Sequence, residues 1–187
     1  MNYFDEPQEN LRTRTNRMTE DEDMWMRSGL FAIRISYGCF LLCLNGECGV
    51  ECSYVYGYNS ARHLLNAFAD LLENKCKKRW ILFPDEPVAE LLKLERAEDT
   101  LNMEVYNTHR DKQSHNFAFG DPKDWERHIA DCIFKSSSDI MWAAKRLRNE
   151  FGLYVNGDGR QLYDQHWMGF PQKEYDRLLC VIRSMKS

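Results

Sequence analysis

The sequence predicts an α+β protein in which an antiparallel sheet of about five strands, in the order β-β-α-β-β-β, precedes a helical C-terminal half. Three observations predict this class. An Asn-Gly pair at 45–46 separates two β-branched and aromatic runs, as in a hairpin. Apolar residues at helical spacing follow the hairpin, and three short strand-like runs follow that helix. From about residue 121 onward the apolar spacing is helical.

The first element is a hairpin made of residues 30–44 and 47–56. Asn45 and Gly46 favour a two-residue type I′ turn, because both central positions of that turn need a positive φ. A two-residue turn fixes which residues of the two strands lie opposite each other. It therefore also decides which side chains share a face of the ribbon.

Four of the seven cysteines lie in this hairpin, and the predicted register puts all four on one apolar, buried face. A zinc ion binds each cysteine sulfur at a distance of about 2.3 Å. The two cysteine pairs are about 13 Å apart along the strand, so one zinc ion cannot bind all four. We therefore expect free thiols, no metal and no cofactor, with cross-strand disulfides as the alternative. The expected opposed pairs are Cys43 with Cys48 and Cys39 with Cys52.

A helix follows the hairpin, and three strands follow the helix. Asn59 or Ser60 can cap the helix, and its apolar stripe continues at helical spacing to Cys76. A polar turn through Glu98 and Asp99 joins the last two strands. The three strands are expected at residues 79–83, 88–96 and 101–107.

The C-terminal half is predicted to be helical. Asp121 followed by Pro122 is a helix-start signal, and capping-box-like spacing from Ser136 to Asp139 starts a second helix that Gly152 ends. A polar loop and Pro171 precede the last amphipathic stretch. The helices are expected over residues 121–133, 136–152 and 171–185.

Composition limits the class of function. The 187 residues, 43 % of them hydrophobic, fit a single α+β domain over 24–187, and residues 1–23 lack apolar periodicity and are expected to form a flexible arm. A net charge of -4 argues against nucleic acid as a partner. The apolar runs are too short to span a membrane and no signal-peptide core is visible, so we expect a cytoplasmic protein.

Motifs for catalysis are missing from the sequence. It contains no P-loop, nucleophile elbow or dinucleotide fingerprint, so we expect a binding protein and not an enzyme. The alternative is a small hydrolase or nuclease in which His109 and His115 act as an acid–base pair. A third interpretation is a structural subunit that associates with itself through an aromatic loop.

Two features would suit a protein interface. Carboxylates around the later strands would attract a basic partner, and an aromatic loop before Pro171 would supply anchor residues. The alternatives are solvated charges and aromatic residues that belong to the core. The predicted partner-binding residues are Asp85, Glu86, Glu98, Asp99, Tyr163, His166, Trp167 and Phe170.

The run from Leu64 to Tyr106, a helix followed by RWILF, PDEP, VAELLKLER, AEDT and LNMEVY, resembles small bacterial proteins of the toxin-immunity type. The resemblance covers less than half of the chain and is one of architecture. It implies an acidic, cytoplasmic, non-enzymatic protein that binds a secreted toxin domain and occludes its active site. It transfers no site residues, because the family has no fixed binding motif. An immunity or antitoxin-type inhibitor is the function we expect.

Overall fold

The computed structural model describes residues 30–36, 38–53, 58–84, 89–108 and 125–185. Within these ranges seven strands form two antiparallel sheets, in the orders β1-β2-β3 and β4-β5-β6-β7. The α+β class is confirmed, with two sheets in place of one sheet of about five strands. The elements are β1 (Phe31–Ser36), β2 (Cys39–Leu44), β3 (Cys48–Ser53), α3 (Ser60–Leu72), β4 (Lys78–Phe83), β5 (Glu90–Ala97), β6 (Thr100–Thr108), the 3-10 helix η3 (Glu126–His128), β7 (Ile129–Asp139), α5 (Ile140–Gly152), α6 (Gly157–His166) and α7 (Gln172–Ser184).

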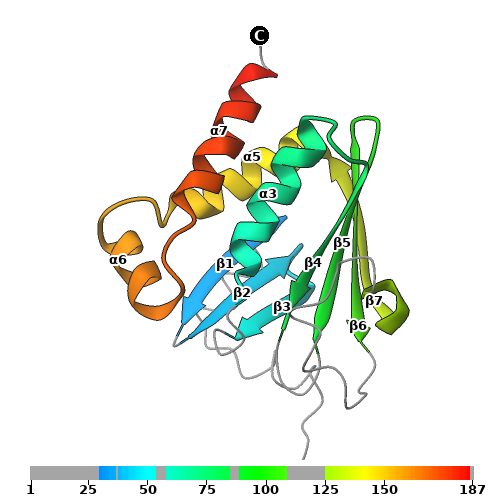
Figure 1. Ribbon diagram of the computed structural model, residues 1–187, viewed down its shortest axis with the longest axis horizontal. Coiled ribbons are helices and arrows are strands. Elements are labelled where there is room, and N and C mark those ends of the chain that lie inside the picture. The colour runs from blue at the N-terminus through cyan, green and yellow to red at the C-terminus, as the bar shows by residue number, and fades with distance from the viewer. Residues whose placement is uncertain (1–29, 37, 54–57, 85–88, 109–124, 186–187) are drawn as a thin grey trace, which may run out of the picture.

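The helices are arranged unevenly around the sheets. Figure 1 shows α3 lying across the strands, α7 beside α3, and α6 apart from the others at the end of the molecule near β1 and β2. The predicted arm, residues 1–23, lies outside the described residues. Among the described residues, no helix is long and apolar enough to cross a membrane.

The first predicted strand, residues 30–44, is wrong as a single element. It is divided into β1 and β2, which pair with each other from Phe31 opposite Leu44 to Ser36 opposite Cys39. Gly38, with a φ of 86°, lies in the reversal between them. Glycine adopts this left-handed conformation without steric penalty, so one glycine is enough to fold a long apolar run back on itself.

The β2–β3 hairpin forms, but its register is one residue away from the prediction. Asn45 and Gly46 have the expected positive φ values of 54° and 67°, and Glu47 N donates to Leu44 O at 2.9 Å. The ladder nevertheless starts one residue later, with Leu44 opposite Cys48. The positive φ values were therefore predicted correctly, whereas the two-residue turn and the pairing were not, since three residues, 45–47, connect the strands.

This shift divides the four hairpin cysteines between two faces, because a one-residue slip moves alternate side chains across the sheet. Cys48 and Cys52 share the face of Phe40, Leu42 and Leu44, all buried in the main core. The prediction had placed those three apolar residues on the opposite face. All seven cysteines are free thiols, and those of the hairpin are Cys39, Cys43, Cys48 and Cys52.

The four-stranded sheet confirms three predicted strands and overturns one predicted helix. β4, β5 and β6 lie where the sequence places them. Within 125–133, the described part of the helix expected over 121–133, the chain instead forms η3 and the start of β7, which pairs with β6 and has register shifts on both sides of Tyr106. Trp125, Ile129 and Ile133 have helical spacing, but tertiary context overrides this local pattern, because the segment pairs with the edge of the sheet at β6.

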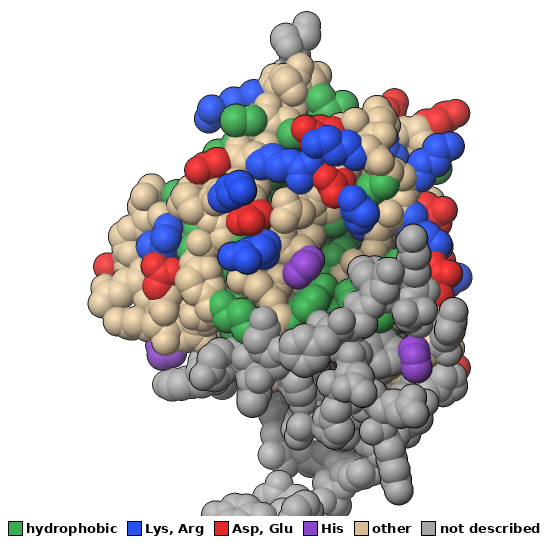
Figure 2. All heavy atoms as spheres, in the orientation of Figure 1, with side chains coloured by type: hydrophobic (Ala, Val, Ile, Leu, Met, Phe, Trp, Pro, Cys, Tyr) green, Lys and Arg blue, Asp and Glu red, His purple; other side chains and the backbone are tan. Residues whose placement is uncertain are grey.

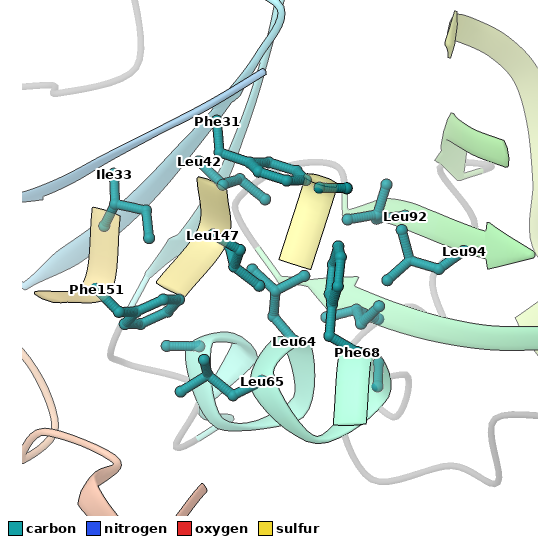
Figure 3. Packing of buried hydrophobic residues seen from close by; sticks show 14 of the residues in the cluster. Phe31, Ile33, Leu42, Leu64, Leu65, Phe68, Leu92, Leu94, Leu147 and Phe151 are labelled. Atoms are coloured by element: carbon teal, nitrogen blue, oxygen red, sulfur yellow. The ribbon is translucent and has the colours of Figure 1, made fainter. Parts of the chain in front are cut away.

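The main core lies between α3, α5 and the inner faces of both sheets. In Figure 3, Phe68 and Leu64 of α3 point toward Phe31 and Leu42 of the first sheet and Leu92 of the second. Nine of the 13 residues of α3 are buried. Because hydrophobic stabilisation scales with the apolar surface buried, and α3 buries more residues than α5, α6 or α7, we expect α3 to stabilise the fold most among these helices.

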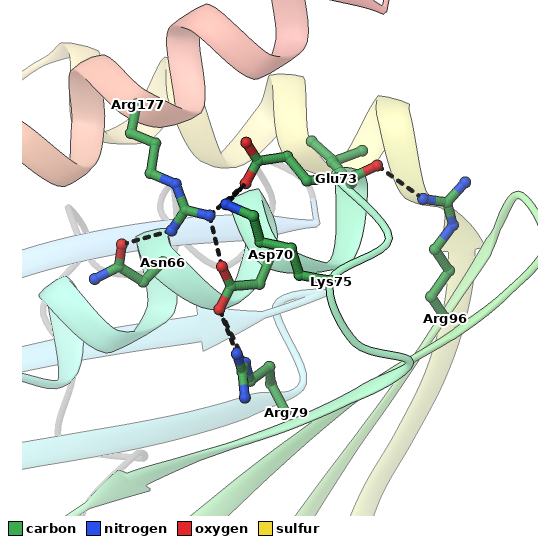
Figure 4. A network of polar contacts seen from close by, with 8 residues as sticks. Asn66, Asp70, Glu73, Lys75, Arg79, Arg96 and Arg177 are labelled. Carbon is green, nitrogen blue, oxygen red and sulfur yellow. Dashed lines mark hydrogen bonds and ion pairs between the residues drawn. The ribbon is translucent and has the colours of Figure 1, made fainter.

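A polar network fastens α3 to α7 and β4 on the outside of this core (Figure 4). Arg177 donates to Asp70 Oδ1 at 2.6 Å and also contacts Glu73. Arg79 binds the other oxygen of Asp70 at 2.6 Å. Burial raises the pKa of Asp70, but the hydrogen bonds from Arg177 and Arg79 outweigh burial and hold that pKa below its ordinary value.

The segment between α5 and α7 was predicted to be a loop and contains the short helix α6. Tyr163 is its one buried residue among ten. Gly159 lies so close to the carbonyl of Leu153 that an added Cβ would come within 2.0 Å of that oxygen. A glycine is therefore required for α6 to approach the end of α5.

Candidate functional site

The β5–β6 turn and the start of α5 lie together at one end of the molecule. Thr100 pairs with Asp139 across β6 and β7, and Ile140 N donates to Asp99 O at 2.8 Å. We call this end the acidic tip, defined by Glu98, Asp99, Asp139 and Trp142.

The side chains of the acidic tip are open to solvent. Trp142 is 48 % exposed, and the side chain of Asp99 is 93 % exposed. Asp139 caps α5, because its Oδ1 accepts the backbone N–H of Trp142 at 2.6 Å. Figure 2 shows acidic side chains projecting at the end where Figure 1 places the β5–β6 turn, with basic side chains next to them, and both signs of charge also alternate over α3 and α7.

Arg96 anchors the backbone of the tip through hydrogen bonds. Its Nε donates to the carbonyl of Glu98 at 2.6 Å, and its Nη1 donates to the carbonyls of Leu71 and Leu72 at 2.8 and 3.1 Å. The same guanidinium thus holds the turn and caps the C-terminus of α3. Its distance to Asp99 Oδ1 is 3.9 Å, the longest of these contacts, so the carboxylate stays available to a partner.

Glu98 has a strained backbone. Its φ is 55°, and the other non-glycine residues with positive φ among those described are Asn45 and Asn74. The left-handed region costs a glutamate about 1–2 kcal/mol, whereas asparagine tolerates it better and glycine adopts it freely. Strained residues collect at functional sites, so an observed outlier supports a functional hypothesis.

The predicted acidic set is only partly assembled. Asp85 and Glu86 lie outside the described residues. Glu90 is buried, and Glu104 is held by lysines on the face of the second sheet. Of the four predicted acidic site residues, Glu98 and Asp99 are the two that the described part of the chain places together in solvent.

The outer face of the second sheet carries a row of paired charges. Trp80, Lys93, Glu104 and Lys135 lie opposite one another on successive strands. Glu104 binds Lys93 at 3.1 Å and Lys135 at 3.2 Å, and it accepts the hydroxyl of Tyr106 at 2.6 Å. The Tyr106 hydrogen bond, helped by the lysines, lowers the pKa of Glu104 to about 2. These groups satisfy each other, and we interpret the row as structural.

The predicted aromatic anchors are buried. The exposed fractions of Tyr163, Trp167 and Phe170 are 0 %, 6 % and 6 %. His166 is half-buried, and its backbone carbonyl accepts a hydrogen bond from the N–H of Gly38 at 2.9 Å. Trp167 packs on Phe40, with ring centroids 5.9 Å apart. In this conformation these residues belong to the core and offer a partner little surface.

In the described part of the chain, titratable groups outside the acidic tip do not assemble into a catalytic constellation. The alternative acid–base pair, His109 and His115, lies outside the described residues. His63 stacks flat on Tyr58, with centroids 4.4 Å apart, and burial lowers its pKa. Burial also raises the pKa of Cys48 to about 12, which suppresses the thiolate. The described residues contain no group of three or more metal-ligating side chains.

The sequence prediction missed Asp139 and Trp142 as site residues. Asp139 was recognised as part of a capping signal, but not as the cap itself. Trp142 could have been found by drawing the helix, because Ile140, Ala144 and Leu147 define its buried face and Trp142 lies away from them.

The comparisons with known proteins do not assign the chain to a class. No protein-family model matches it, and neither a curated protein nor a solved structure gives a significant match. Its function must therefore be argued from its own residues.

Proposed function

We propose that the protein is a non-enzymatic binding module that uses the acidic tip to hold a basic protein partner. The resemblance of residues 64–106 to toxin-immunity proteins extends this proposal to the partner's identity. The partner would be a cognate toxin domain that the bound module occludes.

One observation carries the proposal: the exposed Asp139 caps the N–H of the exposed Trp142, and the same helix start is hydrogen-bonded to the exposed Glu98–Asp99 turn. Trp142 is 48 % exposed. Tryptophan is among the residues that contribute most binding energy at protein interfaces, so an exposed one suits a binding site. Asp139 ends β7, and Asp99 lies in the β5–β6 turn directly before Thr100, which pairs with Asp139. A basic partner could bury the indole of Trp142 and pair its cationic side chains with the carboxylates of the tip.

The strain at Glu98 supports the same proposal. A glycine there would remove the backbone penalty of the left-handed conformation, whereas this sequence has a glutamate at the exposed turn. Because Arg96 fixes the turn, a partner would not have to order it on binding. Such preorganisation lowers the entropic cost of association.

The experiment is affinity purification from the native host followed by binding kinetics with the captured partner. The two kinds of residue should act on different rate constants. Charge reversal with Glu98→Lys and Asp99→Lys should reduce the association rate and its salt dependence, since exposed charges act through steering. Trp142→Ala should mainly speed dissociation, because it removes a buried contact.

Matched controls distinguish the tip from general surface effects. Asp131→Lys reverses an exposed charge on β7, and Leu153→Ala removes an exposed apolar side chain from the end of α5. Both should leave the kinetics unchanged. Equal effects of tip and control variants, or capture of nucleic acid alone, would reject the proposal. So would turnover of a substrate that is lost on replacing His109.

A further inference from the structure

We infer that residues 157–170 form an opening unit, which detaches from the sheet while the rest of the chain stays folded. The inference is independent of the acidic tip. It concerns α6 and the segment up to Phe170, where Tyr163, Trp167 and Phe170 are buried in the conformation described above.

The unit holds together internally. Arg160 binds Asp164 at 2.7 Å and lies over the ring of Phe170 at 5.0 Å. Asp164 Oδ1 in turn accepts the backbone N–H of Phe170 at 2.8 Å. Tyr163 and Phe170 pack edge to face, with centroids 5.1 Å apart. These contacts join the two ends of the unit, so it can move as one body.

Its attachment to the remainder is imperfect. Tyr163 Oη and Trp167 Nε1 are buried and have no hydrogen-bond partner. A buried donor without a partner destabilises the closed state, because it has lost its hydrogen bonds to water. Opening returns both groups to solvent. The closed unit is held by ring packing on Phe40, Phe151, Tyr154 and Tyr175 and by two hydrogen bonds, from Gly38 N to His166 O at 2.9 Å and from Arg160 to Gln172 at 3.0 Å.

Two glycines lie at the ends of the unit. Gly157 has a φ of 60°, and an added Cβ would meet no atom within 4 Å at either Gly157 or Gly169. Glycine has no Cβ that restricts φ and ψ, so the backbone at both positions can adopt a wider range of conformations, as suits a hinge. Opening would uncover Trp167 and Phe170 together with the rings beneath them.

A neighbouring tyrosine provides a matched comparison. Tyr154 lies 5.6 Å from Tyr163 between ring centroids, and its hydroxyl donates to the carbonyl of Ile33 at 2.9 Å. Two buried tyrosines in contact thus differ in whether the hydroxyl is paired. Replacing Tyr154 by phenylalanine removes a hydroxyl that has a hydrogen bond, whereas replacing Tyr163 removes a hydroxyl that has none.

Hydrogen–deuterium exchange of the full chain, read by mass spectrometry, tests the inference. Amides of 157–170 should exchange well before those of α3. Tyr163→Phe should slow that exchange by about tenfold, because the closed state no longer buries an unpaired hydroxyl. Tyr154→Phe should not slow it and should lower the melting temperature. Exchange of 157–170 only with global unfolding, or faster exchange in Tyr163→Phe, would overturn the inference.

Discussion

α3 and α6 are helices of similar length that are held in different ways. α3 buries nine of its 13 residues, whereas α6 buries one of ten. Asn59 caps α3 through a hydrogen bond to the N–H of Arg62 at 3.0 Å, and Arg96 binds its last carbonyls. Asn156, at the start of α6, makes no such side-chain bond.

The difference shows that being helical does not by itself determine how stable a segment of this protein is against local unfolding. Short helices are marginal in water, and packing of an apolar face provides most of their stability in proteins. α3 should therefore unfold only with the whole core, and α6 should open locally. The following predictions test that contrast from the largest effect to the smallest.

The largest effect is expected where α3 meets both sheets. Phe68 is fully buried and packs edge to face on Phe31, with centroids 5.7 Å apart. Phe68→Ala should lower the free energy of unfolding by about 3–5 kcal/mol, through lost burial and a cavity. Urea unfolding measures it. Leu162→Ala, which shortens an exposed leucine of α6, should change the value by less than about 0.5 kcal/mol. Comparable losses would contradict the contrast.

The second effect concerns the carboxylate that fastens α3 to α7. Asp70 accepts from Arg79 and Arg177, so Asp70→Asn should destabilise the protein by about 1.5–3 kcal/mol near neutral pH. Its folded pKa lies below the unfolded value. The stabilisation is therefore complete above the unfolded pKa and is lost as pH falls through the folded one.

Urea unfolding of both proteins across that range checks the sign. The difference between wild type and Asp70→Asn should shrink as the solution is acidified below about pH 4. Asp176→Asn, at an exposed aspartate of α7, should show no comparable trend. A difference that grows on acidification would mean that the pair does not act as described.

The same contrast explains which elements the sequence could predict. α3 and α7 have long apolar stripes, and the Glu98–Asp99 turn joins two well-patterned strands, so local pattern and tertiary packing agree there. α6 has no apolar stripe, because a single tyrosine anchors it. A loop was the natural prediction for a segment with so little pattern.

The errors in the strands have other causes. In both registers of the β2–β3 hairpin each face carries apolar residues, so alternation could not choose between them. In the 121–133 stretch, helical spacing was a coincidence on an edge strand with two register shifts. Glu98 and Asp99 were identifiable as exposed acids. The position of Trp142 beside them depends on the pairing of β6 with β7, which this mistaken helix concealed.

The smallest global effect, and the sharpest local one, is expected at Gly159. A Cβ there would lie 2.0 Å from Leu153 O, a backbone atom that cannot swing aside, so Gly159→Ala must push α6 away from the end of α5. Because α6 contributes little burial, the melting temperature should hardly change, while amide exchange over 157–170 accelerates. Gln161→Ala, at an exposed position of the same helix, is the control and should leave both the melting temperature and the exchange unchanged. If Gly159→Ala instead unfolds the whole protein at lower temperature, α6 is part of the same cooperative unit as α3, and the two helices differ in burial alone.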